Sequence, residues 1–127
     1  MTFFKTFPNM SNNNTNDIIA IVEKQYPDTC KEFIAIQKEH YETFCKKQFD
    51  YGPGNISLGS SLESFDERKA SISAIVVRLN DKMQRLINLV LRKGLTDSAN
   101  EPVFDSFLDI SVYGIIAEIV KRGKWAK

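Results

Sequence analysis

The sequence predicts an all-α protein, a small bundle of about four helices. The first observation is a set of segments in which apolar residues recur every three or four positions, the spacing of one helix face. The second is that short stretches rich in glycine, proline, asparagine and serine separate these segments. The third is a length of 127 residues with 43% hydrophobic and 26% charged residues, which suits one globular domain with a core.

We therefore expect a single all-α domain over residues 17–127, preceded by a flexible arm over residues 1–16. The arm begins with an aromatic hook made of Phe3, Phe4, Phe7 and Pro8. It continues from Asn9 to Asn16 as an Asn/Ser/Thr run whose apolar content is too low for packing.

Two helices follow the arm. A short helix over residues 17–25 is predicted to be capped by Asn16, to turn Ile18, Ile19 and Val22 inward and to end before Pro27. A longer helix over residues 28–47 is indicated by apolar residues at helical spacing: Cys30, Phe33, Ile34, Tyr41, Phe44 and Cys45. The two cysteines lie too far apart on one rigid helix to form a disulfide, and we expect buried, reduced thiols.

Helical periodicity stops between Asp50 and Ser61, where glycine, proline and hydroxyl residues gather. Such a segment can orient backbone N–H groups toward an anion, as phosphate-binding nests do. A solvent-exposed connection is the simpler interpretation of the same composition.

The helix over residues 71–93 has the clearest pattern. One stripe contains Ile72, Ile75, Val76, Leu79, Met83, Leu86, Ile87 and Val90, and Gly94 supplies a C-cap. Another face carries Arg78, Asp81, Lys82 and Arg85, which the sequence alone permits to be a solvated surface with internal ion pairs.

The last helix, over residues 101–122, is predicted to begin after Asn100 as N-cap or with a capping box of Ser98 and Glu101. Three acids spaced four apart, Glu101, Asp105 and Asp109, share the sector that continues as Val112, Ile116 and Ile119. An acid at position 101 would favour the helix dipole, but the other two need cations, a metal or ligand groups to be tolerated. Gly123 is expected to end this helix, with Trp125 folding back on the body or covering a partner.

Three ordered blocks of this sequence resemble a known family. They are Asp50-Tyr51-Gly52, then Arg78-Leu79-Asn80-Asp81-Lys82-Met83-Gln84-Arg85-Leu86, then Glu101 with the run from Asp105 to Tyr113. Together they look like the signature blocks of the nucleotide modification associated domain 1 family of phages and prophages. The resemblance covers roughly Glu39 to Trp125. A more distant similarity is to the all-α nucleoside triphosphate pyrophosphatases of the MazG and dimeric dUTPase type.

The resemblance implies a MazG-like bundle that binds a nucleotide in nucleotide metabolism or DNA modification. The charges of the two helices themselves suggest a cleft in which Asp105 and Asp109 would be catalytic carboxylates and one Mg²⁺ would be held by Asp81, Glu101, Asp105 and Asp109. The nucleotide and its phosphates would be bound by Arg78, Lys82, Arg85, Tyr51, Gly52 and Tyr113. The family pattern also differs here, because the last acids stand at i, i+4 and the partner helix offers mixed charges in place of two glutamates.

Three classes of function stay open at this point. One is a Mg²⁺-dependent nucleoside triphosphate pyrophosphohydrolase, and a second is a non-catalytic nucleotide-binding or sequestering protein, favoured by the cations of the 71–93 helix. The third is a structural interaction protein that uses its aromatic arm, with the charged residues forming an interhelical salt-bridge network. In each case we expect a homo-oligomer, a dimer or higher, because about four short helices enclose a small core.

Composition and charge restrict the partners further. Seventeen Lys+Arg against sixteen Asp+Glu leave a net charge of +1, so there is no strong nucleic-acid signal. No apolar run approaches the roughly 20 residues of a membrane span, and no signal-peptide pattern opens the chain. We expect a cytoplasmic protein, in the host cytoplasm if it is phage-encoded. His40 has no partner at zinc-ligand spacing and is expected to be a surface or half-buried helix residue.

Overall fold

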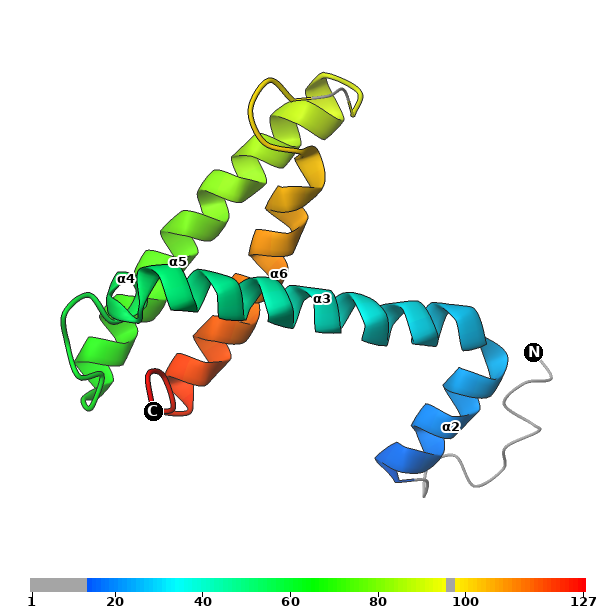
Figure 1. Cartoon of the computed structure of the whole chain (residues 1–127), viewed down its shortest axis with the longest axis horizontal. Coiled ribbons are helices and arrows are strands. Elements are labelled where there is room, and N and C mark those ends of the chain that lie inside the picture. Colours follow the sequence, from blue (N-terminus) through cyan, green and yellow to red (C-terminus); the bar gives the residue numbers. More distant parts are fainter. Residues whose placement is uncertain (1–13, 96–97) are drawn as a thin grey trace. The chain divides into compact units, whose positions relative to one another are not determined.

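The computed structural model describes residues 14–95 and 98–127, and this part of the chain is helical without a strand, which confirms the all-α class. The elements are α2 (Thr15–Gln25), α3 (Pro27–Tyr51), α4 (Gly54–Ser57), α5 (Phe65–Leu86), the π-helix η2 (Ile87–Arg92) and α6 (Val103–Lys121) (Figure 1). None of these helices is long and apolar enough to cross a membrane. The aromatic hook at Phe3, Phe4 and Phe7 lies outside the described residues.

The chain divides into two compact units, one reaching to Glu39 and the other comprising His40–Lys127. The boundary falls inside α3, whose twenty-five residues continue from one unit into the next. The expectation of a single domain over residues 17–127 therefore stays a prediction, and the two units are described separately.

In the first unit, α2 begins earlier than expected. Its N-cap is Asn14, whose side-chain oxygen accepts a hydrogen bond from the Asp17 backbone N–H at 3.0 Å. The prediction of Asn16 as the cap is wrong, because Asn16 already lies within the helix and the flexible arm cannot extend that far. None of the described residues up to Glu39 is buried, so the apolar side chains predicted to face inward are exposed.

The stripe predicted on α3 is also largely exposed. Phe33, Ile34 and Tyr41 all have more than half of their surface accessible, and no residue of α3 is buried. Cys45 is exposed and Cys30 is half-buried, so the expectation of two buried thiols is wrong. The helix also continues four residues beyond the predicted Lys47 and ends where Gly52 takes the left-handed conformation, with φ of 69°.

The core of the second unit joins four helices and the C-terminal end of the chain. Its buried residues are Ile56, Leu62, Ile75, Ile116, Val120 and Trp125, with Phe44 of α3 packed against them. In Figure 1, α5 with η2 and α6 form an antiparallel pair, and these two helices make the main contact of the unit. The 50–61 segment is therefore more than a solvent-exposed connection, because it supplies Ile56 to the core and leads directly into the buried Leu62.

Helix α5 starts six residues before the predicted position. A capping box accounts for this, because the Ser64 hydroxyl accepts from the Glu67 N–H and the Glu67 carboxylate accepts from the Ser64 N–H, both at 3.1 Å. The buried Ser71 hydroxyl donates to the Ile56 carbonyl at 2.7 Å and fastens α4 to α5. At the other end, the expected stop at Gly94 is confirmed, since its φ is 70° and Leu95 N–H donates back to the Leu89 carbonyl.

The C-terminus folds back on the body of the second unit. Gly123 has φ of 69°, and the N–H groups of Gly123 and Lys124 donate to the carbonyls of Val120 and Ile119 in a Schellman motif. Trp125 is 4% exposed, and its indole N–H donates to the Pro53 carbonyl at 3.1 Å. Its ring meets Phe44 edge to face with centroids 6.2 Å apart. Of the two roles left open for this tryptophan, packing on its own body is the one observed.

Candidate functional site

A cavity of about 290 Å³ lies within the second unit, where the end of α3 meets α4, α5 and α6. This size is at the small end of the range for ligand sites. We call it the α3–α5–α6 pocket, and its lining combines three cations, two carboxylates, two tyrosines and an apolar floor: Phe44, Lys47, Gln48, Tyr51, Asn55, Ile56, Arg78, Lys82, Glu101, Asp109, Val112, Tyr113 and Ile116.

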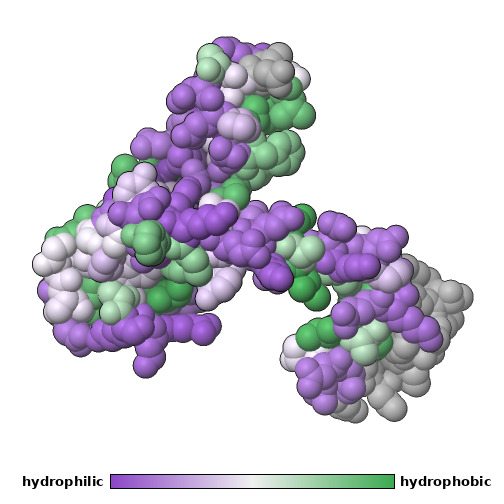
Figure 2. Space-filling view, viewed as in Figure 1, coloured by the Kyte–Doolittle hydropathy of each residue, from purple (hydrophilic) through white to green (hydrophobic). Residues whose placement is uncertain are grey.

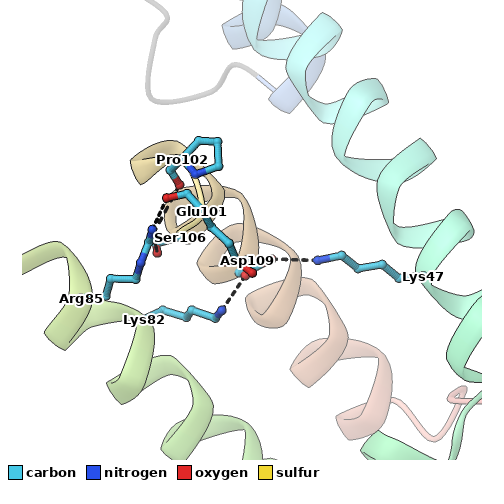
Figure 3. A network of polar contacts seen from close by, with 7 residues as sticks. All are labelled: Lys47, Lys82, Arg85, Glu101, Pro102, Ser106 and Asp109. Atoms are coloured by element: carbon cyan, nitrogen blue, oxygen red, sulfur yellow. Dashed lines mark hydrogen bonds and ion pairs between the residues drawn. The ribbon is translucent and has the colours of Figure 1, made fainter. Parts of the chain in front are cut away.

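Asp109 of α6 holds two lysines from two other helices. Its Oδ1 lies 3.1 Å from Lys47 Nζ on α3, and its Oδ2 lies 2.9 Å from Lys82 Nζ on α5. Figure 3 shows both ammonium groups pointing at the carboxylate from opposite sides. Only 13% of the Asp109 side chain is exposed, whereas Lys82 and Lys47 keep 28% and 53%. Of the cations, metal or ligand groups that this acid was expected to need, the structure supplies cations.

The electrostatics of this cluster follow from its contacts. Burial acts to raise the pKa of Asp109, but the hydrogen bonds and charges of Lys82 and Lys47 outweigh it and hold that pKa below its usual value. The hydrogen bond from Lys82 to Asp109 raises the pKa of Lys82, against the opposing effect of burial. Asp109 and Lys82 are therefore both charged at neutral pH, and one carboxylate with two lysines gives the cluster a formal net charge of +1.

Arg78 lines the same pocket but pairs with no carboxylate of the described residues. Its guanidinium lies over the Tyr113 ring, 5.9 Å from the centroid, and donates to the Asn55 carbonyl at 2.7 Å. A guanidinium between an aromatic face and a carbonyl keeps its charge and is restricted to one orientation. Of the predicted aromatic contacts, Tyr113 and Tyr51 both line the pocket, and Tyr51 is 72% exposed at its rim.

Arg85 stands outside the pocket lining and anchors the start of α6. It donates to the Ser106 hydroxyl at 2.7 Å, to the Pro102 carbonyl at 3.3 Å and to the Glu101 carbonyl (Figure 3). The predicted capping by Asn100, or by Ser98 with Glu101, is wrong. Pro102 occupies the N-cap without a side-chain hydrogen bond, and the arginine satisfies nearby carbonyls instead.

The four carboxylates predicted to bind Mg²⁺ do not gather. Glu101 and Asp109 line the pocket, but Asp81 and Asp105 are exposed and lie outside its lining. Asp105 stands in the first turn of α6, where the helix dipole favours it, so it does not need a cation. Within residues 14–95 and 98–127, no three His, Cys, Asp or Glu side chains are grouped to hold a metal ion. A cation at Asp109 would have to displace two ammonium groups, so these residues do not fit Mg²⁺.

The structure also gives the positions of two further residues considered from the sequence, Gly52 and His40. Gly52 ends α3 and is absent from the pocket lining. His40 is half-buried, as expected, with Nδ1 3.2 Å from the Ser111 hydroxyl.

Lys47 lines the pocket and pairs with Asp109, but the sequence did not predict it as a site residue. It was expected only as the last residue of a helix, and its pairing with Asp109 depends on where α3 crosses α6. The available signal was indirect, because a half-buried acid on α6 required a cation from somewhere. Comparisons with protein-family models, with curated proteins and with solved structures return no match for this chain.

Proposed function

We propose that this chain is a non-catalytic nucleotide-binding protein, with the α3–α5–α6 pocket as its ligand site. The observation that carries the proposal is the convergence of Lys47, Arg78 and Lys82 with two tyrosines on one cavity. Ammonium and guanidinium groups bind phosphate oxygens, and a tyrosine ring can stack on a base. The resemblance to the nucleotide modification associated domain 1 family, and a cytoplasmic role in phage nucleotide metabolism or DNA modification, belong to the same proposal.

The charge balance of the pocket supports binding over catalysis. Its lining has three cations against two carboxylates, and Asp109 is already neutralised by the two lysines. A Mg²⁺-dependent pyrophosphohydrolase would require Asp105 and Asp109 to act on one metal, and Asp105 is exposed outside the lining. We therefore place the sequestering or sensing role first and the hydrolase second.

Calorimetric titration of the full chain with nucleoside mono- and triphosphates tests the proposal. Arg78→Met should weaken nucleotide binding about tenfold or more, because it removes a charged hydrogen-bond donor from the pocket. Arg92→Met is the matched control, since Arg92 lies exposed on η2 outside the lining and should leave affinity unchanged. Circular dichroism of both variants checks that the helices are intact.

Two results would contradict this function. If no nucleotide binds to the wild-type chain, the pocket is a structural salt-bridge cluster. If the chain converts triphosphates to monophosphates and pyrophosphate with Mg²⁺, and Asp109→Asn abolishes that turnover, the hydrolase is correct.

We also propose that the chain forms a homo-oligomer through its first unit. Ile18, Ile19 and Val22 of α2 are exposed, as are Phe33 and Ile34 of α3. Hydrophobic patches interrupt the hydrophilic surface over α2 in Figure 2. An isolated helix of eleven residues is marginal in water, so a second copy that covers this apolar face would stabilise it.

A further inference from the structure

The Asp109 cluster has a feature that a metal site would not have. Each oxygen of the carboxylate faces a different ammonium group, so the acid brings together two cations that would otherwise repel each other. Both lysines line the pocket, and each ammonium has three N–H donors, of which the carboxylate accepts one. The remaining donors are available to oxygens of a ligand.

We infer that the pocket binds the phosphate of a nucleoside monophosphate without a divalent cation, with Lys47 and Lys82 as the phosphate ligands. Asp109 is then a positioning residue that acts through the two lysines and does not touch the ligand. This inference rests on the proposed function and names the ligand class and the binding mode of that site.

Size and charge favour the monophosphate over the triphosphate. The cavity of about 290 Å³ is near the lower limit for ligand sites, so there is little room for three phosphates with a base. The lining contributes a net charge of +1, counting three cations and two carboxylates. A phosphate monoester adds less negative charge than a triphosphate, and no metal ion is then needed to neutralise the excess.

Glu101 places a further restriction on the ligand. Its carboxylate lines the pocket, and Arg85 holds its backbone carbonyl, which fixes the segment before α6. A carboxylate repels additional phosphates but accepts hydrogen bonds from hydroxyl or amino groups. The phosphate is therefore expected at the lysines, and the neutral part of the ligand toward Glu101 and Tyr51.

The test is the affinity of the full wild-type chain for nucleoside 5′-monophosphates and triphosphates, measured by calorimetry in excess EDTA and again in excess Mg²⁺. We expect the best monophosphate to bind with the same affinity, within about twofold, under both conditions, and more tightly than its triphosphate. Binding that requires Mg²⁺, or a triphosphate preference, would overturn the inference while leaving the proposed function intact. Absence of binding under both conditions would overturn the proposed function itself.

Variants assign the roles of the individual residues. Lys47→Met and Lys82→Met should each weaken monophosphate binding in EDTA about tenfold or more. Lys46→Met and Lys69→Met are matched controls, because these lysines are exposed on the same helices outside the lining and should bind like the wild type. Equal losses in a control and its partner variant would overturn the assignment of the phosphate ligands.

The positioning role of Asp109 has its own readout. Asp109→Asn should weaken monophosphate binding in EDTA, and Asp109→Glu, which keeps the charge, should restore part of the affinity. If Asp109 only repelled the anion, Asp109→Asn would bind more tightly than the wild type, and the positioning role would be refuted. Circular dichroism and the unfolding midpoint of both variants separate these outcomes from loss of the fold.

Discussion

At the scale of single residues, Asp109 joins three helices of the second unit at the candidate site. Its carboxylate joins α3, α5 and α6 through Lys47 and Lys82, and only 13% of its side chain is exposed. The free energy that an ion pair at this depth contributes to stability lies between two limits. An exposed pair contributes about 0–1 kcal/mol, and disrupting a buried pair costs about 3–5 kcal/mol. Arg78 and Arg85 form no such ion pair with the described residues, and both donate to carbonyl groups instead.

Asp109→Asn should lower the free energy of unfolding by about 1–3 kcal/mol at neutral pH. The folded state holds the pKa of Asp109 below its unfolded value, so its stabilisation is complete above about pH 4 and is lost as the pH falls through the folded pKa. The difference between wild type and variant should therefore shrink in acid. Urea unfolding curves at a series of pH values measure it.

Asp81→Asn is the control for this change, because Asp81 is exposed on α5 and should alter stability little at any pH. Lys82 sets the alkaline limit of this stabilisation, because Asp109 raises its pKa. The stability that the charged Lys82 contributes is present below that pKa and is lost as the pH rises through it. A wild-type–variant difference that does not change between acid and neutral pH would contradict the ion-pair account.

At the scale of elements, the α6 region has two glycines, and only one of them has a backbone conformation that favours glycine. Gly123 has φ of 69° in the Schellman motif, a conformation that costs other residues about 1–2 kcal/mol. Gly114 lies within α6, and a Cβ built there meets nothing within 4 Å. Gly123→Ala should therefore destabilise the protein by about 1 kcal/mol, whereas Gly114→Ala should stabilise it by roughly 0.5–1 kcal/mol.

Thermal or urea unfolding of the two variants, measured side by side, shows whether their changes in the free energy of unfolding have opposite signs. The substitution is identical in both cases, so each variant is the control for the other. A loss of stability in both would show that the α6 surface at Gly114 is covered by another part of the protein or by a second copy.

Helix identity was predictable from the sequence, and helix boundaries were less so. The apolar stripe of α5 and the glycine stops at Gly94 and Gly123 depend on local chemistry, and the structure has them. The start of α5 was misplaced although Ser64 and Glu67 form a local capping box, because that signal precedes the apolar stripe. The start of α6 could not be predicted from local sequence, because Arg85 donates hydrogen bonds to it from another helix.

The residues of the candidate site also differ in whether local sequence or the packing of helices determines them. Lys82 and Asp109 were predicted because they stand on recognisable helix faces, and the structure pairs them at 2.9 Å. Lys47 was not predicted, because the pairing of residues 62 positions apart depends on how α3 crosses α6. Asp81 and Asp105 were assigned to a metal from spacing, yet both are solvent-exposed.

At the scale of the whole molecule, the two units differ in how many of their described apolar side chains they bury. The second unit has a core that includes Trp125, for which both packing on the body and covering a partner were open from the sequence. The first unit has no buried residue among those described, although its helices carry several large apolar side chains. Large apolar side chains that stay exposed in this way are typical of an interaction surface.

We expect the full chain to be a dimer or a higher homo-oligomer, held by the first unit. The double substitution of Phe33 and Ile34 by Glu should dissociate it, because burying unpaired carboxylates in an apolar interface is unfavourable. Gln37→Glu introduces the same side chain at an exposed position of α3 and is the control, since it replaces a residue that is already polar. Size-exclusion chromatography with light scattering gives the mass of each. A wild-type chain that stays monomeric at all accessible concentrations would refute the oligomer, and the ligand pocket would then have to work within one subunit.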